Sequence, residues 1–351
     1  MEDLSNGPAE VSSAIRDAAM GCLAGVALGD AMGMPSELWT RARVQEHFGW
    51  IDQFMPAPEG HVIVDNFTAG QVTDDTEQTA MLIDAIVEGR GEVKRDVVCA
   101  HFLKWASTDR ATRGNYLGPS SRAAIERLRA GVDFHEAGIG GTTNGAAMRI
   151  APVGIIRSSH DLTSLVDAVY EASVFSHNSD VAMAGAALVA GTISAAISHR
   201  GLAHPRPLDP EDFLEVGLAA AELAAIRGEP VYGPSLVVRT RRALDIARES
   251  TSDDVFSQRI YDIVGTTSLV AESVPASAAL VLRAQGDPMR AAILAANLGG
   301  DTDTIGAIAT GISGAIGGME AIPAESLLAL DAANPWLQIA DRVESLLRFR
   351  R

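Results

Sequence analysis

Two short acidic motifs lie more than two hundred residues apart in the chain, and each combines carboxylates with hydroxyls. They are Thr73–Thr76 (TDDT) and Asp301–Thr304 (DTDT), and both stand at the start of an apolar helical pattern. Four carboxylates in one buried site would repel one another unless cations balance them or their pKa values rise. Two divalent ions would balance the four charges, and oxygen ligands favour Mg²⁺, Mn²⁺ or Ca²⁺ over zinc or copper. The pattern therefore predicts one shared metal site.

Each motif alone also has a simpler interpretation as a helix cap. Asp and Thr are favoured N-cap residues, and acidic side chains in a first turn are stabilised by the helix dipole. The second motif partly matches an EF-hand calcium loop, but Ile305 and Ile312 stand where that loop needs oxygen ligands. Because both motifs are doubly acidic and rich in hydroxyls, a shared site is favoured over two independent caps.

The chain of 351 residues carries 28 Lys and Arg against 45 Asp and Glu, which gives a net charge of −17. This balance disfavours nucleic-acid and anionic-membrane surfaces, so we expect neither partner. A pyrophosphate-bearing ligand would also be repelled at long range and would rely on a metal, local arginines or helix N-termini. The length allows a large core without a composition break. One domain over residues 1–351 is therefore preferred to two, with residues 1–10 as a flexible tail.

Three features bear on the compartment. Cys22 and Cys99 are isolated in apolar patterns, which is typical of buried thiols in a reducing compartment. The polar segment Met1–Pro8 lacks the basic and apolar parts of a signal peptide. The longest apolar stretch, Val181–Ile197, is interrupted by small and polar residues and is short for a membrane span. We therefore expect a cytoplasmic protein.

Helical periodicity prevails along the chain, and strand signals are almost absent. The segment His61–Val64 could extend briefly, but nothing alternates with the helices as a parallel sheet would require. Abundant Ala and Gly, with only 5% aromatic residues, indicate close helix packing, so we predict an all-α fold. The expected helices cover Val11–Leu28, Thr76–Gly89, Val93–Ala106, Ser120–Ala130, Leu162–Phe175, Asp180–His199, Glu211–Ile226, Ser235–Ala247, Pro275–Gln285, Pro288–Asn297, Thr304–Ile316 and Asn334–Leu347.

A glycine-rich segment, Gly138–Gly145 (GIGGTTNG), is the most informative of the predicted loops. Its glycines permit close backbone approach, and successive amides can cradle phosphate or ribose oxygens. Taken alone, such a segment is more often a flexible connection. It does not match a dinucleotide fingerprint, because Thr143 falls where the third glycine should be.

The second acidic motif, within Gly299–Thr304 and followed by a glycine-rich run to Gly318, resembles the C-terminal signature of the ADP-ribosylglycohydrolase family. That family includes the dinitrogenase reductase activating glycohydrolases. The resemblance runs from about Ala18 to Gly318, and its motifs follow the family order. The other motifs are Gly25–Gly33 with Glu37, Thr73–Thr76, Asn144–Arg149 with Pro152–Gly154, and Ser176–Asn178 followed by Asp180.

The resemblance implies a compact, orthogonal multi-helix fold and a metal-dependent hydrolase of a ribosyl N- or O-glycosidic bond. Two Mg²⁺ ions are expected, with Mn²⁺ as the alternative. The substrate would be an ADP-ribosyl or ribosyl compound, an ADP-ribosylated protein among the options. Such a hydrolase must hold the ribose diol, place a water and supply carboxylates near an oxocarbenium-like state. The metal ligands that we predict are Thr73, Asp74, Asp75, Asp301, Asp303 and Thr304.

The resemblance also implies roles around the metals. Asp303, or another carboxylate such as Asp75, would be the general base. Glu37 resembles the family glutamate that lies over the metal site and would gate it or assist proton transfer, although its context alone is typical of a solvated loop charge. A histidine occurs in the family in the context of His177, whereas a lone histidine near a helix start is more often structural. The predicted substrate-binding residues are Gly141, Thr143, Asn144, Gly145 and His177.

The roles of two further polar residues remain open in the sequence. Arg149 could bind a phosphate bidentately or pair with a core carboxylate. Asp30 is expected to cap or brace the first helix.

One departure from the family concerns the substrate. Members that bind ADP-ribose often have an aromatic ring, which stacks on adenine, where this chain has Gly265–Val270, without an aromatic. Such stacking is worth roughly 1–3 kcal/mol per base. A smaller riboside or nucleoside is therefore the alternative substrate, although Tyr232 or Tyr261 could restore a stack. A third interpretation is a non-catalytic, metal-dependent sensor of ADP-ribose or a nucleotide.

Overall fold

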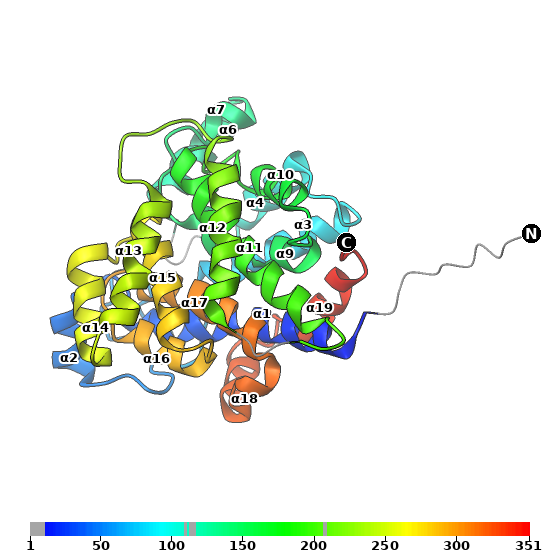
Figure 1. Cartoon of the computed structure of the whole chain (residues 1–351). Helices are drawn as coiled ribbons and strands as arrows, with labels where there is room; N and C mark the ends of the chain where they lie inside the picture. The colour runs from blue at the N-terminus through cyan, green and yellow to red at the C-terminus, as the bar shows by residue number, and fades with distance from the viewer. Residues whose placement is uncertain (1–10, 109–110, 112–116, 206–208) are drawn as a thin grey trace, which may run out of the picture.

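The computed structural model describes residues 11–108, 111, 117–205 and 209–351, so the predicted tail at residues 1–10 lies outside the described chain. Within these ranges the regular structure is helical, and only isolated β-bridges occur (Figure 1). The segment His61–Val64 forms turns rather than a strand. The prediction of an all-α fold is confirmed.

Each predicted helix has a counterpart, and most bounds agree within a few residues. Three bounds differ by five residues: α1 ends at Gly33 instead of Leu28, α15 begins at Val270 instead of Pro275, and α19 begins at Ile339 instead of Asn334. Among the described residues, six α-helices (α2, α7, α8, α9, α14 and α18) and the short helices η1, η2 and η3 were not predicted. The helices are α1 (Ser13–Gly33), η1 (Met34–Ser36), α2 (Arg41–Phe48), α3 (Asp74–Glu88), α4 (Arg95–Trp105), α6 (Pro119–Arg129), α7 (Phe134–Ala137), α8 (Gly145–Met148), α9 (Ala151–Ile156), α10 (Leu162–Ser173), α11 (Asp180–Arg200), α12 (Pro210–Ala225), α13 (Leu236–Glu249), α14 (Asp253–Arg259), the π-helix η2 (Ile260–Val264), α15 (Val270–Arg283), α16 (Pro288–Ala296), α17 (Thr302–Gly317), η3 (Met319–Ala321), α18 (Ala324–Ala333) and α19 (Ile339–Leu347).

Helices α1 and α17 pack against each other at backbone contact. A Cβ atom on Gly21 would lie 2.4 Å from the carbonyl oxygen of Gly314, and one on Gly33 would lie 2.2 Å from that of Thr302. Any larger side chain would push the helices apart, which explains the glycines in both sequences. The pairing is antiparallel, because the end of α1 meets the start of α17. It therefore brings the segment after α1 beside the second acidic motif.

In the described part of the chain, two helices are long and apolar enough to cross a membrane by length and composition, namely residues 13–36 and α11. In the structure, 94% and 89% of their apolar windows are buried inside the protein. Figure 1 shows α11 among the central helices, with α12 packed beside it. Both helices thus supply core packing, and the free thiols of Cys22 and Cys99 are buried as expected.

The predicted start at Pro275 is wrong, because α15 begins at Val270 and contains the proline. A proline within a helix cannot donate a hydrogen bond to the carbonyl four residues earlier. Here that carbonyl belongs to Ala271, and it accepts a hydrogen bond from Nη1 of Arg239 at 3.2 Å. The arginine of α13 thus supplies the missing donor. Nothing local in the sequence indicates this partner.

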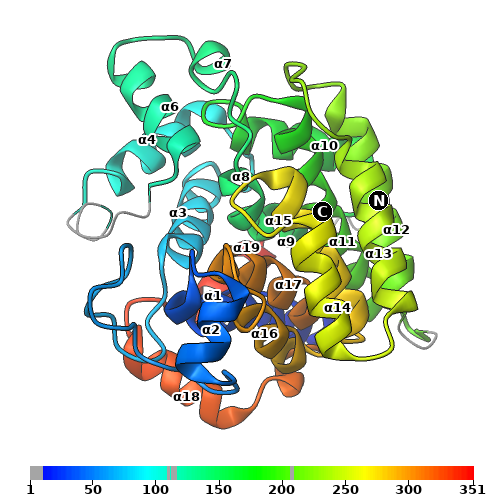
Figure 2. The same ribbon diagram turned by 90° about the vertical axis from the view of Figure 1, so that its left-hand side faces the viewer.

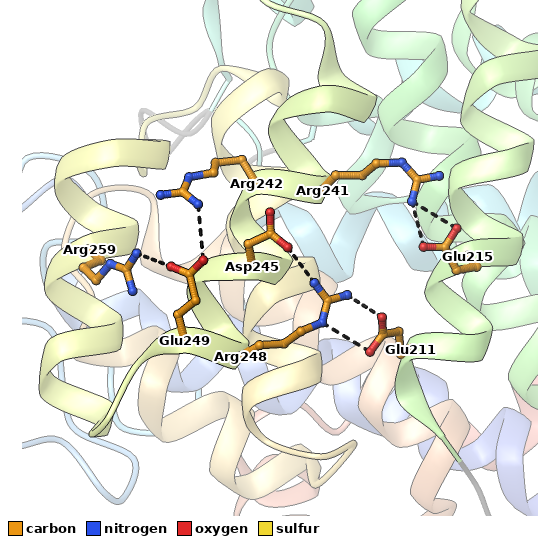
Figure 3. A network of polar contacts seen from close by, with 8 residues as sticks. All are labelled: Glu211, Glu215, Arg241, Arg242, Asp245, Arg248, Glu249 and Arg259. Atoms are coloured by element: carbon orange, nitrogen blue, oxygen red, sulfur yellow. Dashed lines mark hydrogen bonds and ion pairs between the residues drawn. The ribbon is translucent and has the colours of Figure 1, made fainter.

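Ion pairs on the surface join α13 to its neighbours α12 and α14 (Figure 3). Exposed pairs of this kind contribute about 0–1 kcal/mol each, so their effect is on the placement of helices more than on stability. Since α13 packs on α15, they support the helix whose preceding loop reaches the site described below. The pairs Arg241–Glu215 and Arg248–Glu211 reach α12 and the pair Arg259–Glu249 reaches α14, whereas Arg248–Asp245 and Arg242–Glu249 lie within α13.

Candidate functional site

The starts of α3 and α17 meet at a cavity of about 520 Å³, a size typical of ligand pockets. In Figure 2, α6 lies above α3, and α1 and α17 lie below it. One wall of the cavity is acidic, and the facing segments come from α6, the glycine-rich loop and the loop before α15. The polar residues that line it are Glu37, Asp74, Asp75, Ser121, Arg122, Glu126, Thr143, Asn144, Ser268, Asp301, Asp303 and Thr304.

Hydroxyl groups connect the two acidic motifs directly. Oγ1 of Thr73 lies 3.5 Å from Oδ2 of Asp75 and 3.5 Å from Oδ2 of Asp303. Oγ1 of Thr304 donates to Oδ2 of Asp75 at 3.3 Å. The structure thus brings the two predicted half-sites together from opposite ends of the sequence.

Several carboxylate oxygens of this cluster have no protein partner. One oxygen each from Glu37, Asp301 and Asp303 lies within 4.8 Å of the others, and all three residues are buried. Oε2 of Glu37, Oδ1 of Asp75 and Oδ1 of Asp303 are buried without a hydrogen bond. A buried acceptor without a hydrogen bond lowers the stability of the fold. A hard divalent cation is the partner that a set of such oxygens binds best. The residues therefore fit a metal site of the predicted kind.

Burial and mutual repulsion shift the acidities of the cluster. Burial raises the pKa of Asp303 well above its usual value, and the carboxylate of Asp301 raises it further. Burial also raises the pKa of Asp301, but a hydrogen bond from Asn144 partly offsets this rise. Without cations the site should hold extra protons, and a bound metal would displace them. The pKa values of Glu37, Asp74 and Asp75 are raised well above their usual values by burial first and by neighbouring carboxylates second.

Asp30 does not cap its own helix as expected. It is fully buried near the end of α1, and its carboxylate accepts hydrogen bonds from the backbone N–H and hydroxyl groups of Thr73 and Thr76. It therefore caps α3, whose N-cap residue Thr73 makes no side-chain cap of its own. Burial outweighs these hydrogen bonds and raises the pKa of Asp30 to about 6. The first helix thus holds the first acidic motif in place.

The glycine-rich loop contributes only part of the predicted substrate-binding set. Thr143, Asn144 and Gly145 line the cavity, and Nδ2 of Asn144 donates to the carboxylate of Asp301. Gly141 and His177 lie behind this surface. A Cβ atom on Gly141 would come within 2.9 Å of the His177 backbone, and the His177 side chain is fully buried. Their predicted direct contact with substrate is therefore corrected to a supporting position.

Neither interpretation of Arg149 is right. Its guanidinium is fully buried and reaches neither the cavity nor a core carboxylate. It donates instead to the side chains of Gln78 at 3.1 Å and Ser176 at 2.7 Å and to the carbonyl of Gly145 at 2.9 Å. The arginine thus ties α3, the glycine-rich loop and the turn before α11 together.

Sequence reasoning did not identify the wall formed by α6. Ser121 and Arg122 stand in the first turns of this helix, and Ser268 lies in the loop that lacks the expected aromatic. Among the residues that the structure describes, no aromatic ring lines the cavity. Tyr232 is fully exposed, and Tyr261 is also absent from the lining. The sequence predicted a helix from Ser120, one residue after the observed start at Pro119, but it did not indicate that this helix lies near the acidic motifs.

We expect the metal-free protein to lose stability as the pH rises from about 4 through about 6. Burial raises the pKa of Asp30 from 3.8 to about 6 and that of Asp303 well above its usual value. The folded state then binds more protons than the unfolded chain in this window, so the free energy of unfolding falls as the pH rises. Melting temperatures measured in a chelator across this range check the sign.

The Asp303→Asn variant tests the contribution of the site, because it removes one titrating carboxylate and also the repulsion by which Asp303 raises the pKa values of Glu37 and Asp75. Its melting temperature should fall less than that of the wild type over the same pH range. An equal or larger fall in the variant would contradict the assignment.

Comparisons with known proteins show the family of this chain. A model of the ADP-ribosylglycohydrolase family matches residues 11–350. The uncharacterized protein YegU of Escherichia coli (strain K12) is 42% identical over 318 residues, covering 90% of this chain and 92% of that protein. The ADP-ribosyl-dinitrogen reductase glycohydrolase of Rhodospirillum rubrum is 24% identical, covering 90% and 91%. A solved structure, an ADP-ribosylglycohydrolase-related protein complex, matches 97% of this chain and 100% of its own with a TM-score of 0.68 at 22% identity.

These findings carry different weights. The solved structure supports the fold alone, because its sequence identity is low. The family model spans nearly the whole chain, and its members are glycosyl hydrolases that act on ADP-ribose glycosidic bonds. The protein is therefore a glycosidase, and the chain belongs to the ADP-ribosylglycohydrolase family.

Proposed function

We propose that this protein is a Mg²⁺-dependent hydrolase that releases ADP-ribose from an ADP-ribosylated protein or an ADP-ribose derivative. The observation that carries the proposal is the set of unpartnered, buried carboxylate oxygens of Glu37, Asp75 and Asp303 around one ligand-sized cavity. Family membership supplies the class of bond. We also place the enzyme in the cytoplasm, as the sequence predicts.

The residues of the site are suited to cleavage at the anomeric carbon. The carboxylates would stabilise the positive charge that develops on the ribose. Oδ1 of Asp303 or of Asp75 would accept a proton from the attacking water, since neither oxygen is already hydrogen-bonded. When bound, two Mg²⁺ ions would hold the ribose diol and lower the pKa of a water. Their ligands would be Thr73, Asp74, Asp75, Asp301, Asp303 and Thr304.

The backbone around Glu37 favours proton transfer over gating. The next residue, Leu38, donates to the carbonyl of Gly300 at 2.7 Å, and the N–H of Gly300 donates to the carbonyl of Trp39 at 2.8 Å. The carbonyl of Glu37 is also hydrogen-bonded to the ring of His61 at 3.0 Å. The segment is thus tied to the loop that carries the second motif. We propose that Glu37 moves a proton within a fixed site.

The lack of an aromatic ring among the described lining residues supports a second candidate. A nucleosidase-like hydrolase of a small N-riboside needs the ribose-directed carboxylates but no adenine stack. The same acidic wall would perform this reaction. The two candidates differ only in what the cavity binds beyond the ribose.

One experiment separates these functions. The metal-free protein is incubated with Mg²⁺, Mn²⁺ or chelator and with ADP-ribosylated peptides, O-acetyl-ADP-ribose and simple nucleosides, and the released sugar is identified. We expect ADP-ribose release that requires the metal. At a hundredfold excess over its dissociation constant, the metal should also stabilise the fold by about 2.7 kcal/mol. Ribose release from nucleosides alone would favour the second candidate, and turnover in chelator would contradict the metal requirement.

A further inference from the structure

A continuous chain of hydrogen bonds runs behind the cavity wall. It begins at Asp74, whose Oδ2 accepts from Nε2 of Gln78 at 2.9 Å, and Oε1 of Gln78 accepts from Arg149 at 3.1 Å. Arg149 donates to Oγ of Ser176 at 2.7 Å, which lies 2.9 Å from Nδ1 of His177. The chain ends where Nε2 of His177 lies 3.1 Å from the hydroxyl of Thr143, which lines the cavity.

The donors in this series of hydrogen bonds determine the tautomer of His177. An arginine can only donate, so Oγ of Ser176 accepts from Arg149 and its own hydrogen must go elsewhere. The nearest acceptor is Nδ1 of His177 at 2.9 Å, and the alternative carbonyl of Ser173 lies at 3.4 Å. Complete burial, and secondarily the charge of Arg149, lower the pKa of His177 well below its usual value, so the ring is neutral. A neutral ring whose Nδ1 accepts carries its hydrogen on Nε2 and donates to Thr143.

We propose that Thr143 is a specificity-determining hydrogen-bond donor to the substrate, and that Arg149, Ser176 and His177 are positioning residues that impose this role. Because Oγ1 of Thr143 accepts from His177, its own hydrogen is left to be donated into the cavity. The site thereby offers one hydrogen-bond donor to an oxygen acceptor of the substrate at this point. The inference rests on the proposed function, since the ligand is the substrate of that reaction.

The surroundings of Thr143 favour an anionic oxygen as the acceptor. Its N–H lies 3.4 Å from the hydroxyl of Ser120 in the first turn of α6, where the helix dipole is positive. Ser121 and Arg122 of the same helix also line the cavity. The guanidinium of Arg122 and the hydroxyl of Ser121 can donate, whereas Glu126 adds one carboxylate from the same helix. An oxygen of a phosphoryl group attached to the ribose has the matching chemistry.

The close packing at Gly145 keeps the histidine in this geometry. A Cβ atom there would lie 2.9 Å from Cε1 and 3.0 Å from Nε2 of His177. Glycine thus leaves room for the ring that supports Thr143. The presence of glycine at position 145 thus has a steric explanation that does not depend on any contact with substrate.

The tautomer can be tested without any activity. In the full-length protein with ¹⁵N-labelled histidine, the nitrogen shifts of the His177 ring should show a protonated Nε2 and an unprotonated Nδ1. The signal is assigned by its loss in the His177→Gln variant. A ring protonated on Nδ1, or on both nitrogens, would overturn the proposed direction of these hydrogen bonds.

Substrate contact is tested by a double-mutant cycle on the metal-loaded enzyme with an ADP-ribosyl compound. Thr143→Val should raise KM by roughly tenfold or more with little change in kcat, because it removes a hydrogen bond to a charged group. Thr143→Ser keeps the hydroxyl and should stay near the wild type. His177→Leu should raise KM less, whereas His177→Gln retains a donor and should restore it.

The cycle distinguishes positioning from a general loss of structure. If His177 acts through Thr143, the effect of His177→Leu on KM should disappear when Thr143→Val is already present. An equal effect in both backgrounds, or an unchanged KM in Thr143→Val, would overturn the proposal. A wild type without turnover of any ADP-ribosyl compound would overturn the proposed function and the substrate contact, and the ¹⁵N shifts would still decide the tautomer.

Discussion

The Asp303→Asn variant is expected to lose roughly a thousandfold of its hydrolytic activity while its metal-free form unfolds at a higher temperature than the wild type. Asp303 is buried, and its Oδ1 has no hydrogen-bond partner. The amide removes a negative charge that a metal or a developing cation would need. The measurement is kcat/KM with saturating Mg²⁺, together with melting curves in chelator.

The rise in stability follows from the same carboxylate. Burial and the nearby charges of Asp301, Asp30 and Asp74 raise the pKa of Asp303, which means that its ionised form destabilises the fold. An uncharged amide removes that repulsion, so we expect the melting temperature to rise by roughly 1–3 °C near neutral pH. The wild type should regain more than this difference on binding metal, and the variant should respond little. Function at this site is thus kept at the expense of the stability of the metal-free fold.

An exposed aspartate supplies the control. Asp52→Asn makes the same chemical change on the surface, away from the cavity, and should leave both activity and melting temperature near those of the wild type. An Asp303→Asn variant that keeps its activity would remove Asp303 from the metal and base roles. A lower melting temperature in chelator would contradict the account of the repulsion.

The acidic motifs were predictable because their chemistry is local. Each motif begins a helix, and hydroxyls beside carboxylates at two helix starts indicated a shared site before any contact was known. The antiparallel packing of α1 on α17 was not visible: abundant Ala and Gly indicated close helix packing, but not that Gly21 would meet Gly314. The all-α prediction followed from periodicity, which sequence reports directly.

The supporting residues were not predictable, because their partners are distant in the sequence. Asp30 caps a helix that starts 44 residues later in the chain. Arg149 was considered only for a phosphate or a carboxylate, since neutral acceptors such as Ser176 leave no signal in composition or spacing. Gln78 is the exception. Its spacing of four residues from Asp74 on one helix is a known pairing distance, so this hydrogen bond could have been expected.

The 2′-deoxy form of an otherwise good substrate is expected to lose far more activity than a substrate truncated at the pyrophosphate. Asp75, Asp301 and Asp303 line the cavity, and on the proposed function they and the metals that they would bind hold the ribose diol. A site built for a hydroxyl leaves buried polar groups unpaired when that hydroxyl is absent, so we expect a loss of roughly a thousandfold or more. The comparison requires matched ADP-ribosyl, ribosyl and 2′-deoxy-ADP-ribosyl compounds with one leaving group, assayed for kcat/KM.

Truncation should cost much less because the described lining offers the adenine no aromatic ring. Removing the adenine therefore removes no base–aromatic stack, an interaction that is worth roughly 1–3 kcal/mol per base. What remains to lose is the hydrogen bond from Thr143, roughly tenfold if its acceptor is a phosphoryl oxygen. A preference of several hundredfold for the ADP-ribosyl compound over the ribosyl one would show that the distal adenylate is recognised after all and would exclude the small-riboside candidate. Near-equal rates would instead exclude a hydrogen bond from Thr143 to a phosphoryl oxygen of the substrate. Recognition of the ribose would then be the main source of specificity.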